Sequence, residues 1–149
     1  MIPQFVAVAA DEEDLLLTMM QEFYLGEALP FDRDAARRAV RELRGDPSLG
    51  RVYLVVAGGE AVGYVVLAFG FSLEYRGRDA FLDELYIREN ARGVGLGTAA
   101  IQWAESVCRA EEIRALHLEV DRRNQRGQHL YRGLGFTDHD RYLMTKWID

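Results

Sequence analysis

The sequence predicts an α/β protein with a mixed, mostly antiparallel, twisted sheet of six or seven strands and helices on both faces. Residues 51–57 and 60–69 are apolar, β-rich runs separated by Gly58-Gly59, which is a strong hairpin signal. Residues 80–120 read as strand, helix and strand, a crossover unit that implies a locally parallel pair. Because both hairpin runs are nearly continuous in apolar residues, we expect both faces of the sheet to be covered.

The N-terminal part is predicted to contain one strand and two helices. Residues 5–9 form a short apolar strand, and the acidic residues 11–14 cap a helix that Gly26 and Pro30 end. The apolar face of this helix consists of Leu15, Leu16, Met19, Met20 and Phe23. A second helix over 32–43 has an apolar face and, on its other side, a row that we expect to be solvated, formed by Arg33, Arg37, Arg41 and Arg44.

The remaining elements follow from hydrophobic spacing and turn residues. In chain order they are a polar loop over 70–79, a strand over 80–87, a helix up to about residue 110, a strand over 115–120, a short helix over 126–134 and a final strand over 137–147. The loop carries aromatic residues and is a candidate for lining a pocket.

Length and composition favour one soluble domain over residues 1–149. The net charge of −6, from 24 acidic and 18 basic residues, argues against a nucleic-acid binder and is compatible with a cationic substrate. No apolar run approaches the roughly 20 residues of a membrane span, and the start does not read as a signal peptide. The single cysteine, Cys108, excludes an intramolecular disulfide, so we expect a cytoplasmic protein.

Three alternating glycines, Gly93, Gly95 and Gly97, open the helix that follows the strand over 80–87. The first backbone N–H groups of a helix have no intrahelical acceptor, and they carry the positive end of the helix dipole. Glycine removes the side chains that would keep a ligand away from these donors. The pattern therefore predicts a phosphate-binding turn at this helix start.

Two nucleotide-binding motifs and a packing role compete for this turn. A dinucleotide fold needs a strand running almost directly into G-x-G-x-x-G, with an acidic residue about 20 positions later. Glu119 and Asp121 satisfy the second condition, but Thr98 occupies the third glycine position and residues 88–92 intervene. A nucleoside triphosphate loop would need a lysine that is absent here. The packing alternative is that the glycines only allow close approach.

The run Arg92-Gly93-Val94-Gly95-Leu96-Gly97 resembles the R/Q-x-x-G-x-G/A acyl-CoA-binding signature of the GNAT superfamily of N-acyltransferases. The order of the surrounding motifs is similar as well. The strand L-D-E-L-Y-I precedes the signature, and L-H-L-E-V-D, Asn124 and Tyr131 follow it. The resemblance covers roughly residues 80–136, whereas the N-terminal part agrees only in the order of its elements.

The resemblance implies a GNAT-type fold with a splayed central pair of parallel strands and acetyl-CoA as the acyl donor. Its pyrophosphate would be held by backbone donors of Arg92, Gly93, Val94, Gly95, Gly97 and Thr98. The pantetheine arm would lie between the strands ending at Ile87 and Val120, against main-chain groups of Leu85 and Ile87, and the Leu85 N–H would polarise the thioester carbonyl. Asn124 would bind near the pantetheine; an Asx turn or helix cap is its alternative role.

For the reaction, the resemblance implies one acid and one base. Tyr131 matches the family tyrosine that donates a proton to the departing sulfur, and packing on the sheet is the alternative role. The strand carboxylates Asp83 and Glu84 are similar to those of polyamine-acetylating members, in which a carboxylate activates the amine. Adjacent strand residues point to opposite faces, so the base is either Asp83 or Glu84.

The carboxylates favour a small cationic amine, polyamine-like or aminoglycoside-like, as the acceptor. Protein and amino-acid amines remain alternatives, as does a non-catalytic acyl-CoA sensor, which the presence of Tyr131 disfavours. His117 and Glu119 share a strand face, but no further ligand lies at metal spacing, so no metal is expected. A homodimer stays open.

Overall fold

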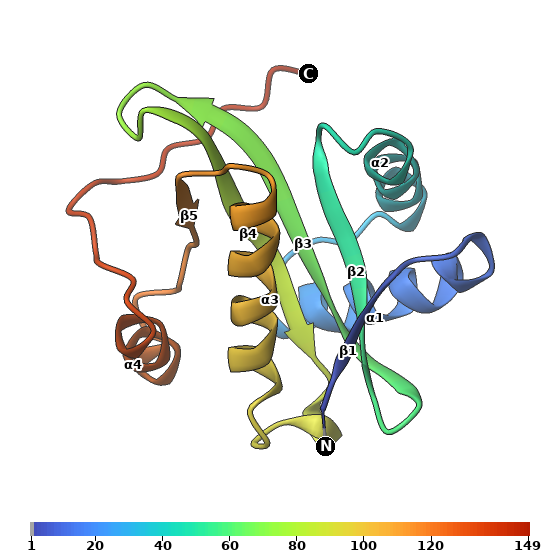
Figure 1. Ribbon diagram of the computed structural model, residues 1–149. Helices are drawn as coiled ribbons and strands as arrows, with labels where there is room; N and C mark the ends of the chain where they lie inside the picture. The colour runs from blue at the N-terminus through green and yellow to red at the C-terminus, as the bar shows by residue number, and fades with distance from the viewer. Residues whose placement is uncertain (1) are drawn as a thin grey trace. The chain divides into compact units, whose positions relative to one another are not determined.

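The computed structural model describes residues 2–149, which form one five-stranded sheet and flanking helices (Figure 1). In chain order the elements are β1 (Gln4–Ala7), the 3-10 helix η1 (Ala10–Glu12), α1 (Glu13–Gly26), α2 (Arg33–Gly45), β2 (Gly50–Ala57), β3 (Glu60–Ser72), β4 (Gly77–Ile87), the 3-10 helix η2 (Glu89–Ala91), α3 (Leu96–Ala110), β5 (Ala115–His117) and α4 (Gln125–Gly133). The chain forms two compact units, Met1–Leu118 and Glu119–Asp149. The single domain therefore stays a prediction.

The sheet follows chain order, β1-β2-β3-β4-β5, and is antiparallel up to β4. Gly58 and Gly59 make the tight β2–β3 turn with φ of 61° and 79°, a conformation that glycine adopts without strain. The predicted loop over 70–79 is wrong, because β3 and β4 pair as far as Ser72 and Gly77 and leave only a short turn between them. This segment is therefore a two-stranded ribbon, and its successive side chains alternate between the two faces of the ribbon.

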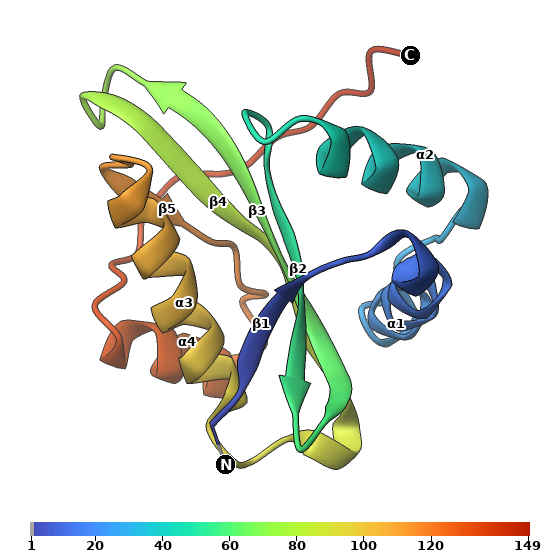
Figure 2. The ribbon, with the colours of Figure 1, turned by 45° about the vertical axis from the view of Figure 1, so that its right-hand side comes forward.

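Helices cover both faces of the sheet in the first unit, as predicted. Figure 2 shows α1 and α2 on one face and α3 on the other. The face under α1 and α2 is filled by a buried cluster that includes Leu16, Leu17, Met19, Leu54 and Tyr64. On α3 the residues that are fully buried are Ala100, Ile101 and Ala104. None of the described helices has the length and apolar character of a membrane span.

The one parallel pair in the described sheet is β4 with β5, and it is short. It joins Asp79 to Ala115, Ala80 to Leu116 and Phe81 to His117 and goes no further. β5 thus ends three residues before the predicted Val120, and the rest of β4 has β3 as its strand neighbour on one edge alone. This arrangement matches the expected splayed pair.

A bulge interrupts β4 at its centre. Leu67 pairs with Leu82 and Val66 with Glu84, so Asp83 is an extra residue in β4. Further along the same ladder the two backbones approach closely at Gly63, where an added Cβ would lie 2.1 Å from the carbonyl oxygen of Tyr86. A bulge bends a strand and strengthens its twist, which turns the end of β4 away from β5.

The predicted final strand over 137–147 is absent, so the described sheet has five strands and not six or seven. Within the second unit, Asp138 at the start of this segment forms an ion pair with Arg132 of α4. This contact keeps the segment beside its own helix end. The following apolar side chains are exposed, namely Tyr142, Leu143, Met144, Trp147 and Ile148.

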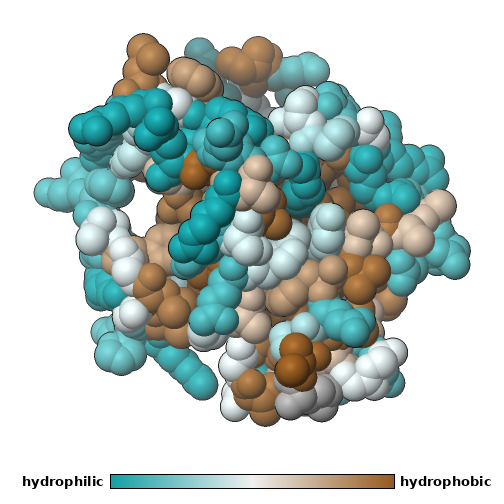
Figure 3. Space-filling view, in the orientation of Figure 1, coloured by the Kyte–Doolittle hydropathy of each residue, from teal (hydrophilic) through white to brown (hydrophobic). Residues whose placement is uncertain are grey.

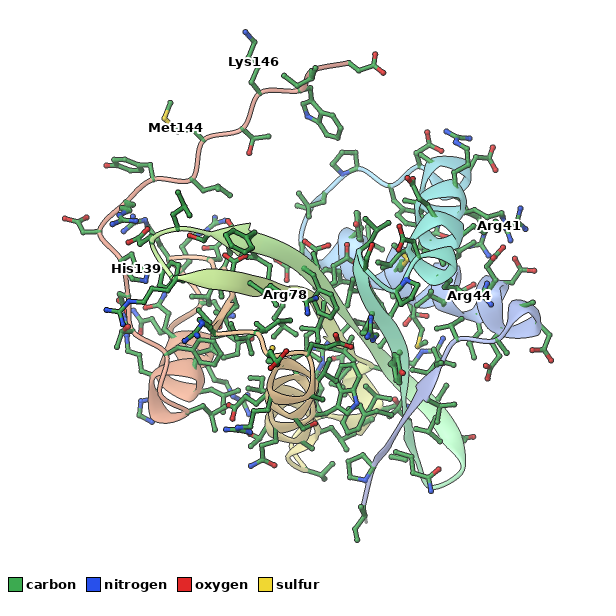
Figure 4. All side chains as sticks on the ribbon, turned by 45° about the horizontal axis from the view of Figure 1, so that its top comes forward. Arg41, Arg44, Arg78, His139, Met144 and Lys146 are labelled. Atoms are coloured by element: carbon green, nitrogen blue, oxygen red, sulfur yellow. The ribbon has the colours of Figure 1, made fainter. Side chains whose placement is uncertain are left out.

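The arginine row of α2 is only partly a solvated face, contrary to expectation. Arg33 contacts Asp14, whereas the buried carboxylate of Glu13 receives hydrogen bonds from Arg37 at 2.7 Å and Arg41 at 3.1 Å, and Arg44 lies 3.4 Å away. Arg41 keeps 64% of its side chain exposed; Figure 4 labels Arg41 and Arg44 on α2. Hydrogen bonds from Arg41 and Arg37 hold the pKa of the Glu13 carboxyl below its usual range. The cluster joins the start of α1 to α2.

We expect Glu13→Gln to lower the melting temperature at pH 7, because three arginines then lose their shared carboxylate. The pKa of Glu13 is depressed in the folded state, so its contribution is present above the unfolded value of about 4.3 and is lost as the pH falls through the folded value. The difference in melting temperature from the wild type should shrink at pH 3, as measured by calorimetry. Glu42→Gln, an exposed change on α2, is the control; an equal effect of both would contradict the cluster's role.

Candidate active site

The glycine turn sits between η2 and α3, where the sequence places it. Gly93 and Gly95 have φ of 85° and 86°, and nothing lies within 4 Å of a Cβ added at either. In the described chain the first N–H of this run to bond within the backbone is that of Ala99, which donates to the Gly95 oxygen at 3.0 Å. The earlier N–H groups of the helix start are therefore available to an anion.

The open character of this turn also appears at the surface. Val94 is 75% exposed, and Ile2 at the start of the chain is exposed too. Figure 3 shows hydrophobic groups at this end of the molecule, where Figure 1 places the start of the chain and the turn before α3. The turn before α3 is therefore exposed to solvent.

The outer edge of β4 carries the main-chain groups of Leu85 and Ile87. The Arg88 N–H donates to the Val62 oxygen of β3 at 2.8 Å. Hydrogen bonding alternates along an antiparallel strand, so the N–H and C=O groups of Leu85 and Ile87 point away from β3. β5 has already ended at this level, which leaves a backbone edge able to pair with an extended ligand.

Arg92 joins this edge to the glycine turn. Its Nε donates to the Ile87 carbonyl oxygen at 2.8 Å, and its guanidinium lies 5.8 Å from the centre of the Tyr86 ring. The side chain is thus folded back on the end of β4. This side-chain contact ties the turn to the end of β4, and the Arg92 backbone is adjacent to the glycines.

The bulge separates the two candidate carboxylates. Asp83 is the extra residue and is exposed, whereas Glu84 is partly buried on the face that α1 covers. The Tyr24 hydroxyl of α1 donates to Glu84 Oε2, and the Tyr64 hydroxyl of β3 donates to Glu84 Oε1 at 2.7 Å. Each oxygen of Glu84 therefore accepts one phenolic hydrogen bond.

Burial dominates the electrostatics of this group. It raises the pKa of the Glu84 carboxyl, the two tyrosine hydrogen bonds oppose this rise, and the charge of Asp83 adds to it. Desolvation also raises the pKa of Asp83. Burial, and then the neighbouring Glu84, push the pKa of Tyr24 and of Tyr64 far above the ordinary phenol range. Both phenols therefore stay protonated and act as donors.

A second cluster ties α1 to the same strand. Glu22 Oε1 accepts from the Tyr86 hydroxyl at 2.9 Å and from Arg88 Nε at 3.2 Å, and its other oxygen pairs with Arg88 at 3.1 Å. Burial acts to raise the pKa of Glu22, but the hydrogen bonds from Arg88 and Tyr86 prevail and lower it. Through Glu22 and Tyr24, the second half of α1 is bound to β4 beside the site.

Asn124 and Tyr131 lie in the second unit. Asn124 caps α4, because its side chain accepts from the Gly127 N–H at 2.9 Å. This is the alternative role that the sequence left open for it. Tyr131 lies on α4, partly buried, with its ring centre 6.1 Å from that of Phe136. Its part in proton transfer stays a prediction.

Sequence reasoning missed the partners of three site residues. Tyr24, Tyr64 and Glu22 gave no motif, since their contacts join separate elements: Tyr24 lies 60 positions before Glu84, Glu22 lies 64 before Tyr86, and Tyr64 lies 20 before Glu84. His117 also has an unexpected partner: its Nε2 lies 3.1 Å from Asp79 Oδ2, between the rings of Tyr75 and Phe81. A tyrosine within an otherwise apolar strand was the one available signal. No group of residues able to hold a metal occurs in the described chain.

Comparison with known proteins agrees with this geometry. The sequence profile of the acetyltransferase (GNAT) family matches residues 16–136. A thialysine N-epsilon-acetyltransferase from Bos taurus is 32% identical over 77 residues, which are 52% of this chain and 45% of that protein. The match therefore spans less than half the length of this relative.

Solved structures share the fold over nearly the whole chain. An integron cassette protein from the mobile metagenome of Cole Harbour Salt Marsh has a TM-score of 0.84 and 36% identity, over 99% of this chain and 90% of that one. An aminoglycoside N-acetyltransferase, AAC(6')-Iy, solved with CoA, has a TM-score of 0.80 and 14% identity, over 99% and 96%. The second similarity concerns the fold alone.

These matches confirm the family and the mixed α/β fold class that the sequence predicted. The profile begins within α1 and extends past α4, so it includes the bulged strand and the glycine turn. Acetyl-CoA, the donor of this family, fits the turn in one further respect: the space beside Gly93, Gly95 and Gly97 is open. The chain belongs to the acetyltransferase (GNAT) family and carries an acyl-CoA-dependent N-acetyltransferase domain.

Proposed function

We propose that this chain transfers the acetyl group of acetyl-CoA to the primary amine of a small cationic acceptor. The observation that carries the proposal is the edge of β4 beyond Phe81, which has no β5 partner and is followed, after η2, by the open glycine turn. An extended amide-containing arm can pair with that edge while a phosphate binds the helix start.

The donor would be held mainly by backbone. The N–H groups from Gly93 to Thr98 bind its pyrophosphate, since the Arg92 N–H already donates to the Glu89 oxygen at 3.3 Å, and the outward groups of Leu85 and Ile87 face its pantetheine arm. The Ile87 oxygen already accepts from Arg92, so the outward N–H groups are the more available partners. Bound acetyl-CoA supplies a thioester carbonyl, which the Leu85 N–H is placed to polarise. Asn124 would contribute to the donor site by capping the start of α4.

We assign Glu84 as the proton acceptor for the amine. Its carboxylate is held by two hydroxyl groups, and burial moves its pKa toward neutrality, where a general base is most effective. Asp83 at the bulge remains the alternative base. Tyr131 is the proposed acid for the departing thiolate, since a phenol is protonated at neutral pH.

A cationic acceptor is favoured by the charges beside the bulge. Asp83 and Glu84 place two carboxylates on consecutive residues. The name of one similar protein, a thialysine N-epsilon-acetyltransferase, supports an amine acceptor of this kind. The acceptor of this chain is therefore expected to carry at least one ammonium group besides the reacting amine.

Thiol release across a panel of amines tests the function. We expect acetyl-CoA turnover with a polyamine or an aminoglycoside and little with neutral monoamines, because the carboxylates attract cations. The free thiol is measured with a chromogenic disulfide. Acetyl-CoA binding without turnover of any amine would instead support a non-catalytic sensor.

We expect Gly95→Ala to weaken acetyl-CoA binding about tenfold or more, as measured by calorimetry. The new Cβ enters the turn, and the left-handed backbone costs a non-glycine residue about 1–2 kcal/mol. Gly59→Ala is a matched control, because Gly59 has φ of 79° and equally open surroundings but lies in the β2–β3 hairpin. Equal losses of affinity in both variants would remove the turn as the binding site.

Replacing each carboxylate by its amide distinguishes the general base from the carboxylate that takes no part in proton transfer. We expect Glu84→Gln to lower kcat about 10²–10⁴-fold and to abolish the fall of kcat at acidic pH, whereas Asp83→Asn keeps that fall. Because burial raises the pKa of Glu84, the wild-type decline should begin above the usual glutamate range. The measurement is kcat against pH at saturating amine. The reverse pattern would identify Asp83 as the base.

A further inference from the structure

Tyr24 connects two parts of the chain that the proposed reaction leaves separate. Its hydroxyl donates to Glu84 Oε2, and its ring lies edge-on to Phe31, with 5.2 Å between ring centres. Its carbonyl oxygen accepts from the Leu29 N–H at 2.9 Å. Phe31 and Leu29 belong to the loop between α1 and α2, so one residue contacts both this loop and the strand carboxylate.

The two donors to Glu84 differ in their setting. Tyr64 is completely buried in the sheet core, whereas Tyr24 lies two residues before the end of α1. The loop that follows α1 contains Ala28 with φ of 55°, and Leu25 and Leu29 beside it are exposed. Tyr64 thus holds one oxygen of Glu84 from a rigid element, and Tyr24 holds the other from an element that ends in an exposed loop.

The charged and titratable groups that face Glu84 come from three elements. They are Tyr24 on α1, Tyr64 on β3 and Asp83 on β4. A hydroxyl that donates to a carboxylate stabilises its ionised form, whereas the neighbouring negative charge disfavours it. Removing one hydroxyl should therefore raise the pKa of Glu84, and Tyr24 is the donor that also contacts the α1–α2 loop.

We infer that Tyr24 is a positioning residue, through which the α1–α2 loop orients the Glu84 carboxylate and controls its protonation. The kinetic consequence of this inference rests on the proposed function, but the tie between Tyr24 and Glu84 does not. Tyr24 acts through Glu84.

The test compares Tyr24→Phe with the wild type. Phenylalanine keeps the ring that packs on Phe31 and removes the hydroxyl alone. Tyr53→Phe is the matched control, because the Tyr53 ring packs on Trp103 of α3, on the other face of the sheet. Glutamate side-chain carboxyl groups labelled with 13C are titrated by NMR, and Glu84→Gln identifies the Glu84 signal.

We expect the Glu84 titration in Tyr24→Phe to move up by about one pH unit, since a hydrogen bond to a charged group is lost, and to stay in place in Tyr53→Phe. The acidic limb of kcat should move by the same amount, with the KM for acetyl-CoA unchanged. In Phe31→Ala, which keeps the hydroxyl but loosens the ring, a smaller shift in the same direction is expected.

Two results would overturn the inference: the Glu84 titration could stay in place in Tyr24→Phe, or Phe31→Ala could leave the titration unchanged. A titration that moves while the acidic limb of kcat does not would instead remove Glu84 as the base of the proposed function and leave the tie to Tyr24 intact. Failure of the wild type to release thiol with any amine is a different result: it removes the proposed function, and the NMR titration of Tyr24→Phe and Phe31→Ala still decides whether the loop holds Glu84.

Discussion

The extra residue in β4 at Asp83 is the constraint on which the site depends. Because Val66 pairs with Glu84 and Leu67 with Leu82, the strand bends in its middle, and β5 follows it only as far as Phe81. The same bend brings about two results. It frees a backbone edge for an extended ligand, and it sends the Glu84 side chain toward α1. The proposed donor site and the proposed acceptor site are thus both consequences of one insertion in a strand.

Helix α1 is held by polar contacts at both ends: by ion pairs with α2 at its start, and by tyrosine hydrogen bonds and an ion pair with β4 in its second half. Glu13 at the start of α1 gathers the α2 arginines, whereas Glu22 and Tyr24 in its second half bind the side chains of β4. Apolar packing lies between these two attachments. Polar contacts therefore determine where the helix lies along the strand, and the hydrophobic cluster determines how closely it approaches.

Most of the fold could be predicted from patterns among neighbouring residues. The two-glycine turn and the helical spacing after Gly97 each concern a few neighbouring positions, and the corresponding elements lie where they were expected. The expected capping of the first helix by residues 11–14 is not found, because the start of α1 has no side-chain cap. The glycine signature and its helix were predictable. The final strand over 137–147 was not, because a strand exists only with a partner, and this segment pairs with no strand of the described sheet. The polar residues of the segment 70–79 predict a loop, because residue polarity alone does not indicate the pairing of β3 with β4.

The contacts of the site were harder to predict, since they join distant positions. Nothing near Glu84 in the sequence indicates Tyr24, 60 residues earlier, or that Arg37 and Arg41 share Glu13. The adjacent carboxylates were recognisable as a pair. Their different surroundings depend on the bulge, which periodicity cannot locate, because one inserted residue reverses the alternation that a strand prediction assumes.

Gly63 has a consequence for the mutational tolerance of this chain. An added Cβ would meet the Tyr86 carbonyl at 2.1 Å, so every other amino acid at position 63 must displace the backbone of β4. Gly95 has open surroundings and is restricted by its φ of 86° and by the ligand it is proposed to bind. A saturation library sorted for folded protein should lose nearly all variants at 63 and keep many at 95. Sorting the same library for acetyl transfer should deplete both, so that the difference between the two selections separates scaffold glycines from those of the turn.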